Sequence, residues 1–382
     1  MKVPAEFDEI RPFGPEDLPA AYERLLAYPM FRTMVEYVFP GKPFDALVAR
    51  MRECKTNLEF QKTFCYPFLV NLLSKVSKGA DMDVKDIDTS CRYTFVSNHR
   101  DIVLDSGFLS ILLLDSGFTT TCEIAIGDNL LSLPWVKDLV RINKSFIVER
   151  GASMRQMLVA SKRLSEYMHF AIAEKNENVW IAQREGRAKD SDDRTQGAIL
   201  KMMAMGGEGG VIERIAQLHI VPLSISYEFD PCDFLKAKEF QQKRDNPDFK
   251  KGKDDDIISM QTGVMGYKGH IHYHCAPCID DFLHQLDPNM PKTEIFDTIA
   301  ARLDTEIHRN YRLYPCNYVA LDLLKNSTQY VSMYTPEDKA QFETYIEGQL
   351  TKIELPNKDE AYLKERLLTM YANPAINYLA TV

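Results

Sequence analysis

The chain has 382 residues, of which 45% are hydrophobic and 26% are charged. These values are typical of a globular protein and exclude a disordered or fibrous chain. The length predicts one large domain with extensions, or two domains. The formal net charge is −9, so we expect no nucleic-acid partner, and an anionic ligand would have to meet a local cluster of Arg and Lys.

The distribution of apolar residues and cysteines predicts a protein without a membrane span. The most apolar stretch, 102–118, is interrupted by Asp105 and Asp115, which makes it a poor spanning helix. Residues 1–14 contain acidic residues and prolines where a signal peptide has a basic and then an apolar stretch. Together with eight scattered cysteines, which we interpret as reduced thiols, these features predict a cytoplasmic protein.

The spacing of apolar residues predicts helices at both ends of the chain and strands between them. Near the N-terminus, apolar residues recur at helical spacing in segments separated by Pro and Gly. From about residue 91 short β-rich runs alternate with helical stretches, and from about 292 the pattern is helical again. In chain order we expect helices at 18–28, 30–39, 44–54 and 58–76, a strand at 92–97, a helix at 102–114, a strand at 145–149, a helix after Ser153, and strands at 179–182, 218–228 and 269–275.

Strands that alternate with helices predict an α/β fold, in which a mixed sheet is flanked by helices and extended by helices at both ends. We expect a helical N-terminal region at 1–88, an α/β domain at 89–290 and a helical C-terminal extension packed on the core at 291–382. Pro222 lies inside the strand predicted at 218–228, which indicates an edge strand or a bulge.

Polar residues that a fold does not need follow three of the predicted strands. His99 and Arg100 follow the first strand, with Asp105 a few positions later; Arg150 follows the second, and the charged stretch 184–190 follows the third. In α/β sheets, ligands bind beyond the carboxyl ends of the strands, where the loops converge. A histidine near an aspartate, with basic residues from neighbouring strands, predicts a general base beside an anion-binding site.

Four segments, in this order, resemble the blocks by which the glycerol-3-phosphate and lysophosphatidic acid acyltransferase family is recognised. SNHRDIVLD at 97–105 resembles the first block, His-x4-Asp, and NKSFIVER at 143–150 resembles the second, an apolar strand that ends in Arg. WIAQREGRAKD at 180–190 resembles the third, a strand followed by Gly and Arg, and HIVPLSISYE at 219–228 resembles the fourth, a strand with Val-Pro. The resemblance covers residues 90–230 and leaves out the two helical ends.

Two positions depart from the family pattern. The family Asp stands five positions after the His, whereas here Asp105 stands at the sixth. One extra residue before the helix would restore the geometry, so we expect His99 in a loop, with Asp101 as an alternative partner. In the third block we align Arg187 with the family Arg, which leaves the role of Glu185 open.

The resemblance implies an O-acyltransferase that moves a fatty acyl group from acyl-CoA or acyl-carrier protein to a glycerol 3-phosphate-type acceptor. The favoured acceptor is 1-acylglycerol 3-phosphate, which would give phosphatidic acid; glycerol 3-phosphate or another lysolipid is the alternative. His99 would act as the general base, and Asp105 would fix its tautomer. This chemistry requires neither a metal nor another cofactor.

The resemblance also implies which residues bind the substrates. Arg150 and Arg187 would hold the acceptor phosphate, because a guanidinium group can bind phosphate through two parallel hydrogen bonds, and Lys189 is the next choice. Arg100, beside the base, would hold a phosphate of the acyl donor. The expected substrate-binding residues are therefore Arg150, Arg187, Lys189, Glu185, Gly186 and Arg100.

Because the acceptor or the product is a lipid, we expect the protein to dock on the inner face of the cytoplasmic membrane as a peripheral protein. Aromatic residues of the N-terminal helices are the candidate contacts with the membrane surface. They are Phe31, Tyr37, Phe39 and Phe64.

Two alternatives belong to other classes of protein. His270, His272 and His274 alternate along a predicted strand, with Cys275 and Cys278 after them, and such residues can bind zinc in a zinc-dependent hydrolase. The other alternative is a non-catalytic lipid-binding protein, in which the displaced aspartate reflects lost activity.

Overall fold

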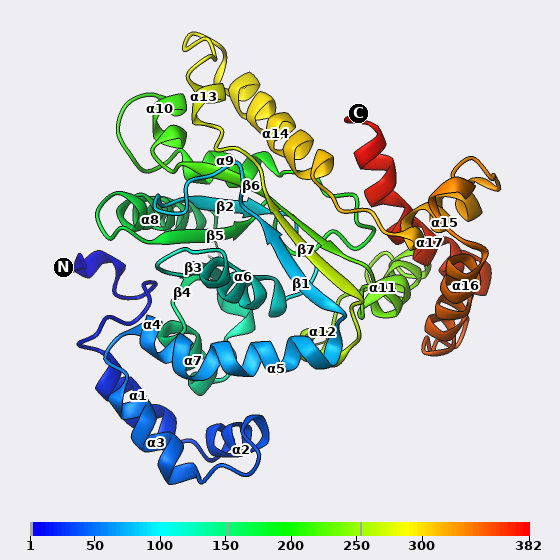
Figure 1. Cartoon of the computed structure of the whole chain (residues 1–382). Helices are drawn as coiled ribbons and strands as arrows, with labels where there is room; N and C mark the ends of the chain where they lie inside the picture. The colour runs from blue at the N-terminus through cyan, green and yellow to red at the C-terminus, as the bar shows by residue number, and fades with distance from the viewer. Residues whose placement is uncertain (1–2, 151–152, 253) are drawn as a thin grey trace.

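The computed structural model describes residues 3–150, 153–252 and 254–382, which are built around a seven-stranded sheet (Figure 1). The strands are β1 (Gly79–Asp83), β2 (Thr94–Ser97), β3 (Cys122–Gly127), β4 (Ser145–Val148), β5 (Asn178–Ala182), β6 (Ile220–Tyr227) and β7 (His270–Cys275). Their order in the sheet is β1-β7-β6-β2-β5-β3-β4. Neighbouring strands are parallel, except that β6 and β7 are antiparallel. The predicted mixed sheet is therefore confirmed.

Two layers of helices cover the sheet, one on each face (Figure 1). On one face, α8 (Met154–Ala173), α9 (Gly197–Met203), α10 (Val211–Ala216) and α14 (Lys292–Arg309) share a core with apolar residues of β2, β4, β5 and β6. On the other face, α5 (Tyr66–Val76) and α6 (Leu104–Asp115) form a second core with the opposite side of the sheet. Nine of the twelve residues of α6 are buried, as expected of a helix without a polar face.

The two ends of the chain form helical clusters of their own. The N-terminal cluster contains α1 (Leu18–Leu26), α2 (Pro29–Val38) and α3 (Phe44–Glu53), followed by α4 (Asn57–Phe60) and the π-helical turn η2 (Gln61–Cys65), and packs on α7 (Pro134–Ile142). The C-terminal cluster contains α15 (Pro315–Lys325), α16 (Pro336–Thr351) and α17 (Glu360–Leu379), which pack on α11 (Asp233–Asp245). The remaining elements are α12 (Asp255–Met265), α13 (Asp280–Leu283), η1 (Ala5–Phe7), η3 (Asp128–Leu130) and η4 (Val331–Met333). In the described parts of the chain, no helix is both long enough and apolar enough to cross a bilayer.

Five strands were predicted and are present, whereas β1 and β3 were missed. β1 (GADMD) is an edge strand whose residues are all half-buried, so it lacks the apolar pattern of a strand. It also falls inside the region 1–88 that we predicted to be helical, yet it pairs with β7. β3 carries Glu123, which is buried against Tyr167 and Lys175. The partners of Glu123 come from α8 and from the residues just after it, so the sequence around β3 does not reveal that Glu123 is buried.

The prediction that Pro222 marks an edge strand or a bulge is wrong, because β6 lies between β7 and β2. Pro222 pairs with Val96 of β2, and its carbonyl accepts from Ala276 N at 2.9 Å, one residue beyond the end of β7. The backbone N and the carbonyl of one strand residue point to the same neighbouring strand. The position where Pro222 lacks an N–H therefore faces the residues just after β7 rather than β2. The proline therefore removes no bond from the ladder between β6 and β2.

The aromatic residues predicted as membrane contacts are only partly exposed. Phe31 is buried beside the ring of Trp135, so its prediction as a contact is wrong. Phe39 and Phe64 pack edge to face against each other. Of the four, Tyr37 alone is strongly exposed. The aromatic rings thus mainly hold the N-terminal helices together.

Candidate active site

The parallel strands β2, β5, β3 and β4 end at the same edge of the sheet, and β5 lies between β2 and β3. The polar segments predicted to form a site follow three of these strands. The loop with His99 leaves β2, the charged segment 183–196 leaves β5, and Arg150 follows β4. The topology therefore brings the three segments to one edge, as expected for a site in an α/β sheet.

His99 lies in the loop between β2 and α6, and its ring contacts a buried carboxylate. Nδ1 is 2.7 Å from Oδ2 of Asp105, which lies in the first turn of α6 and is fully buried. The same oxygen accepts hydrogen bonds from the backbone N of Arg100 at 2.6 Å and of Asp101 at 3.1 Å. Because an ionised carboxylate can only accept, Nδ1 is the donor to it. The loop therefore wraps around the carboxylate, which compensates for the displaced position of Asp105.

Asp101 has a different task in the same loop. Its Oδ1 accepts from the backbone N of Val103 at 2.9 Å and of Leu104 at 2.8 Å, where α6 begins. Asp and Asn side chains commonly satisfy the free N–H groups at a helix start in this way. The structure thus pairs the His99 ring with Asp105, and Asp101 shapes the turn into α6.

The ring of His99 is positioned by β5 and keeps one nitrogen available. It meets the ring of Trp180 edge to face, with the centroids 5.7 Å apart. Trp180 in turn donates to Ser97 Oγ at 3.0 Å. The His99 side chain is 13% exposed, and no described residue forms a hydrogen bond with Nε2. An incoming hydroxyl group can therefore be received at Nε2.

A buried positive charge lies behind the two carboxylates. Lys268 is fully buried and donates to the carbonyls of Gly263 at 2.5 Å and Gly266 at 2.7 Å, at the end of α12. Burial raises the pKa of Asp101, and Asp105 adds to this effect, while Lys268 opposes it. A side chain at Gly263 would collide with the Asp101 carboxylate, so α12 packs directly on the loop. Neither Gly263 nor Lys268 was predicted from the sequence to support the site.

The loops after β4, β3 and β5 meet at Arg150. Its Nη1 is 3.0 Å from Oε1 of Glu185, and its backbone N donates to Oδ2 of Asp128 at 3.0 Å. Both side chains of the Arg150–Glu185 pair are exposed, so the pair is open to exchange with a ligand. Gly186 next to it has a φ of +67°, a conformation that favours glycine. The second and third sequence blocks are therefore in contact.

Two arginines of the third block have unsatisfied nitrogen atoms. Nε of Arg184 and Nη1 of Arg187 are buried, and neither has a hydrogen-bond partner among the described residues. Buried polar atoms are rarely left unpaired, so these atoms are suited to an anion. Arg187 is also close to Asp230: burial raises the pKa of that carboxyl, but Lys236 and Arg187 outweigh burial and lower it. Arg184 was not among the predicted binding residues, and its unpaired Nε is the signal that identifies it.

Lys189 is turned toward the C-terminal part of the chain. Its ammonium group pairs with Glu239 of α11, which also binds Lys243. Burial lowers the pKa of Lys189 to about 8, although Glu239 opposes the shift. Unlike Arg187, Lys189 already has a protein partner for its charge.

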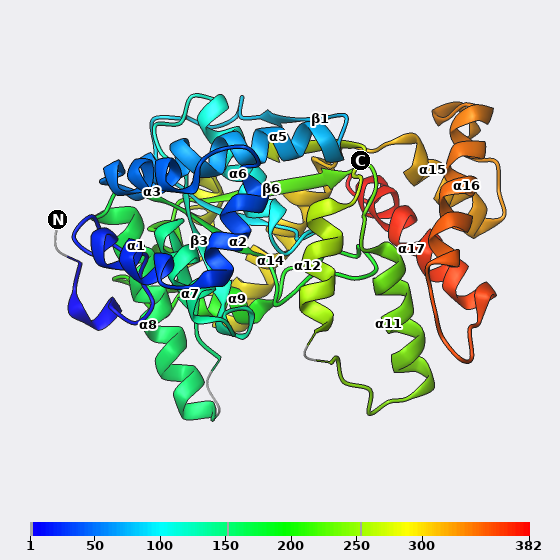
Figure 2. The ribbon, with the colours of Figure 1, turned by 90° about the horizontal axis from the view of Figure 1, so that it is seen from below.

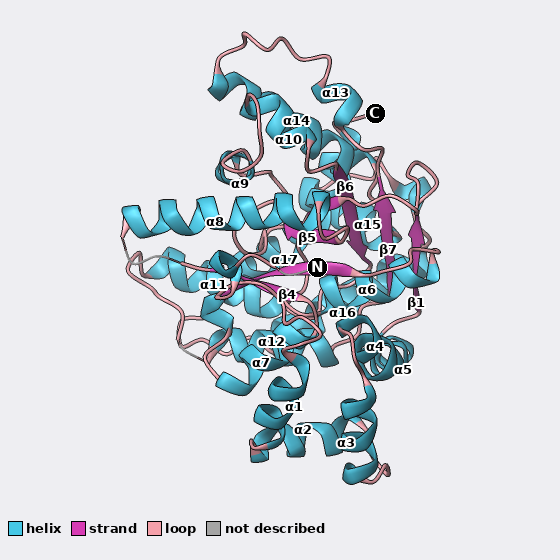
Figure 3. Cartoon of the chain, turned by 90° about the vertical axis from the view of Figure 1, so that its left-hand side faces the viewer, coloured by secondary structure: helices cyan, strands magenta, loops and turns pink. Residues whose placement is uncertain are grey.

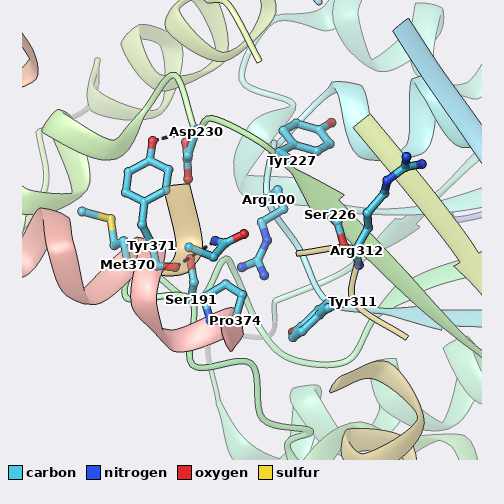
Figure 4. A pocket seen from close by; sticks show the side chains of 11 residues that line it. Arg100, Ser191, Ser226, Tyr227, Asp230, Tyr311, Arg312, Met370, Tyr371 and Pro374 are labelled. Carbon is cyan, nitrogen blue, oxygen red and sulfur yellow. Dashed lines mark hydrogen bonds between the residues drawn. The ribbon is translucent and has the colours of Figure 1, made fainter. Parts of the chain in front are cut away.

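Arg100 follows His99 in the loop but contacts different residues. Its guanidinium group is buried and pairs with Asp193, with Nη2 to Oδ2 at 2.7 Å. Burial alone would lower the pKa of Arg100, but Asp193, Tyr311 and Asp230 together outweigh burial and raise it. The side chain lines a small, partly open cavity between the catalytic loop and the C-terminal helices (Figure 4). The residues that line the cavity include Tyr227, Asp230, Tyr311, Arg312 and Tyr371.

The alternative zinc site is not assembled. His270 and His272 both contact Asp81 of β1, and His274 Nδ1 is 3.4 Å from Oδ2 of Asp83. Their rings are therefore engaged by carboxylates of the neighbouring strand. Cys275 is buried, and Cys278 lies instead near His219 and Asp280, the one group of three metal-ligating side chains found within the described residues. The interpretation of residues 270–278 as a single metal site is thus wrong.

No curated protein matches the chain. The crystal structure of the 1-acyl-sn-glycerophosphate (LPA) acyltransferase PlsC from Thermotoga maritima is similar over 75% of this chain and 94% of that chain, with a TM-score of 0.34 and 11% sequence identity. A similarity this low decides neither fold nor function. The model of the Acyltransferase family matches residues 83–226, which contain His99, Asp105, Arg150 and Arg187. The similarity to this family is thus found in the part of the chain that contains the candidate active site.

Proposed function

We propose that the protein transfers a fatty acyl group from acyl-CoA or acyl-carrier protein to a glycerol 3-phosphate-type acceptor. The acceptor we favour is 1-acylglycerol 3-phosphate, and the product is then phosphatidic acid. The observation that carries this proposal is the His99–Asp105 pair, 2.7 Å apart, at the start of α6 inside the acyltransferase domain. Its free Nε2 is the feature that a hydroxyl acceptor needs.

His99 acts as the general base in this mechanism. Nε2 takes the proton of the acceptor hydroxyl while the oxygen attacks the thioester carbonyl, and Asp105 stabilises the imidazolium that forms. The tetrahedral intermediate then loses the thiolate as the carbon–sulfur bond breaks. The imidazolium returns the proton to the thiolate, so that the ester and the free thiol are released and His99 is neutral again.

The acceptor phosphate binds at the arginines that follow β4 and β5. Arg187 and Arg184 offer nitrogen atoms that are buried and unpaired, and Arg150 offers an exposed guanidinium group that exchanges Glu185 for phosphate. Gly186 permits the tight turn between them. Lys189 contributes less than the arginines, because Glu239 already balances its charge.

The acyl donor approaches from the side of Arg100 in this proposal. Arg100 lines the partly open cavity beyond the catalytic loop and is paired with Asp193. A phosphate of the donor would have to compete with Asp193 for the guanidinium group. The chemistry is complete with the side chains of the chain and its substrates.

The lipid substrate implies a peripheral position on the inner face of the cytoplasmic membrane. The eight cysteines are all free, as a reducing compartment requires. The division into residues 1–88, 89–290 and 291–382 is also a proposal, with β1 assigned to the sheet of the middle part.

A thioester-release assay tests the proposal. Purified protein is offered acyl-CoA or acyl-carrier protein as donor, and glycerol 3-phosphate or 1-acylglycerol 3-phosphate as acceptor. We expect acceptor-dependent release of thiol, fastest with the 1-acyl acceptor, and loss of release in His99→Ala. Faster turnover of glycerol 3-phosphate would identify the first acylation step instead. Binding of lysolipid without any turnover would favour the non-catalytic class.

A further inference from the structure

The first turns of α8 expose large apolar side chains that no part of the described chain covers. Met154 is 87% exposed, Met157 54%, Leu158 62% and Val159 61%. All seven residues from Ser153 to Val159 are exposed, so the helix is open on every side rather than along one stripe. The second half of the same helix is core, with Leu164, Tyr167 and Met168 buried.

Local contacts stabilise this exposed start of the helix. Ser153 Oγ accepts from Gln156 N at 3.3 Å, and Gln156 Oε1 accepts from Ser153 N at 3.0 Å, which is a complete capping box. The exposed turns are therefore held as a helix without tertiary packing. Their apolar side chains are presented in a fixed arrangement.

The charge of this segment is opposite to that of the whole chain. Residues 150–165 contain Arg150, Arg155, Lys162 and Arg163 and no acidic residue, in a chain of net charge −9. Glu149 and Glu166 flank the segment and pair with Arg163 and Lys162. Four basic and two acidic residues leave the stretch 149–166 with a net charge of +2. Such a mixture of apolar and basic side chains is typical of helices that bind an anionic lipid surface.

The exposed turns lie on the same side of the molecule as the catalytic edge. α8 follows β4 and therefore begins at the edge of the sheet where His99, Arg150 and Glu185 lie. Figures 2 and 3 show the N-terminal half of α8 projecting beyond the body of the molecule. In Figure 2, α12 projects in the same direction, and its Ile257 and Ile258 are exposed as well. The other end of α12 packs on the catalytic loop at Asp101.

We propose that the N-terminal half of α8, residues 154–163, inserts its apolar side chains into the surface of an anionic bilayer and thereby presents the catalytic edge to the membrane. Met154, Met157 and Leu158 stand at positions i, i+3 and i+4 and therefore share one face of the helix, with the basic residues Arg155 and Lys162 beside them. This combination suits the boundary between the head groups and the acyl chains of an anionic bilayer. Arg155 and Lys162 then meet the lipid phosphates. α12 forms the second contact through Ile257 and Ile258. This inference rests on the proposed function and names the surface that docks.

Vesicle sedimentation with the full chain tests the inference. The vesicles contain phosphatidylcholine alone or phosphatidylcholine with phosphatidylglycerol, and no substrate is present. We expect wild-type protein to bind the anionic vesicles. The affinity for these vesicles should fall by about tenfold or more in the variant Met154→Gln/Met157→Gln/Leu158→Gln/Val159→Thr. A matched control variant, Val331→Thr/Met333→Gln, changes exposed apolar residues of η4 and should bind like wild type. A second variant, Met30→Gln/Tyr37→Gln, tests the N-terminal helices and should also bind like wild type.

The outcomes separate this inference from the proposed function. Thioester release with a short-chain, monomeric acceptor should be the same in wild type and the α8 variant, because the substituted residues lie outside the catalytic pair. If the α8 variant binds vesicles as wild type does, or if wild type binds no vesicles, the inference is overturned even though activity is intact. A change in oligomeric state by light scattering, without a change in vesicle binding, would identify α8 as a contact between copies of the chain and would also overturn it. If wild-type protein does not turn over the monomeric acceptor at all, the result counts against the proposed function and not against the docking surface.

Discussion

The imidazole of His99 and the carboxylate of Asp105 lie 2.7 Å apart although six positions separate them in the sequence. The contact is possible because His99 precedes α6 and Asp105 is in its first turn. The backbone N–H groups of Arg100 and Asp101 point at the same carboxylate oxygen. One extra loop residue is thus absorbed without moving the ring away from its partner.

Replacement of His99 by Ala should lower kcat by about 10²–10⁴-fold, because the acceptor hydroxyl loses its general base. The fold should remain, since Asp105 keeps its two backbone donors. Release of free thiol from acyl-CoA measures the rate, and circular dichroism reports the fold. His284→Ala, at an exposed histidine, is the matched control and should have the activity of wild type. Equal rates for His99→Ala and wild type would disprove the assignment of the base.

The two aspartates of the loop should respond differently to replacement by Asn. Asp105→Asn places an amide beside Nδ1, which disturbs the tautomer of His99, and kcat should fall by about 10²-fold or more. Asp101→Asn keeps an oxygen for the N–H groups of Val103 and Leu104, since Asn serves at helix starts as well as Asp. It should therefore retain activity within a few-fold of wild type. The opposite result, with Asp101→Asn inactive and Asp105→Asn active, would identify Asp101 as the partner of the base.

Arg187 and Lys189 offer a matched pair for the phosphate site. Arg187→Ala removes a guanidinium group with an unpaired buried nitrogen, and KM for the phosphate acceptor should rise by about 10–100-fold. Lys189→Ala breaks the pair with Glu239 and should change KM much less, with its main effect on the urea midpoint. Steady-state kinetics at varied acceptor concentration separate KM from kcat. A larger effect on KM from Lys189 than from Arg187 would place the phosphate on the side of α11 instead.

The sequence predicted the parts of the site that lie within one strand and the loop after it. Apolar runs identified β2, β4, β5, β6 and β7, and the polar residues after them indicated the edge at which ligands bind. His99 was expected in a loop, which is where it lies. These features depend on residues that are close together in the chain, so a single sequence is enough to predict them.

Features that depend on distant contacts were not predicted. Lys268 and Gly263 lie more than 150 residues after the loop that they support, and only the packing of α12 brings them there. The neighbouring His99 and Arg100 side chains contact Trp180 and Asp193, which are distant from them in the sequence. Phe31 was expected to contact the membrane, and Trp135 of α7 covers it instead. In each case the position of the side chain is determined by a contact with a residue that is distant in the sequence.

The stability of the protein should depend on pH through Asp233. Burial raises the pKa of Asp233 to about 7, and Asp230 adds to this effect. Between about pH 4 and pH 7 the folded chain therefore holds a proton that the unfolded chain has lost, so the free energy of unfolding should fall as the pH rises through this window and level off above it. Urea midpoints measured between pH 5 and pH 8 test this.

The variant Asp233→Asn should remove that pH dependence. It should gain stability relative to wild type as the pH rises, because Asn carries no charge and still accepts from the hydroxyl groups of Tyr345 and Tyr371. The control Asp248→Asn, at an exposed position, should leave the slope unchanged. A steeper loss of stability toward pH 8 in Asp233→Asn than in wild type would contradict the proposed origin.

The buried Arg100–Asp193 pair should fix the C-terminal end of α14 to the catalytic loop. Asp193 also accepts from the hydroxyl group of Tyr311 at 2.5 Å, and its carbonyl contacts His308 at the end of α14. Arg100→Met leaves the Asp193 charge buried without its cation and should destabilise the protein by about 3–5 kcal/mol in urea unfolding. The double variant Arg100→Met/Asp193→Leu should recover part of that loss, because no buried charge remains, although Tyr311 loses its acceptor. If the double variant were less stable than Arg100→Met, the hydrogen bond from Tyr311 to Asp193 would outweigh the cost of burying that carboxylate without its cation, and the proposed cause of the loss would be wrong.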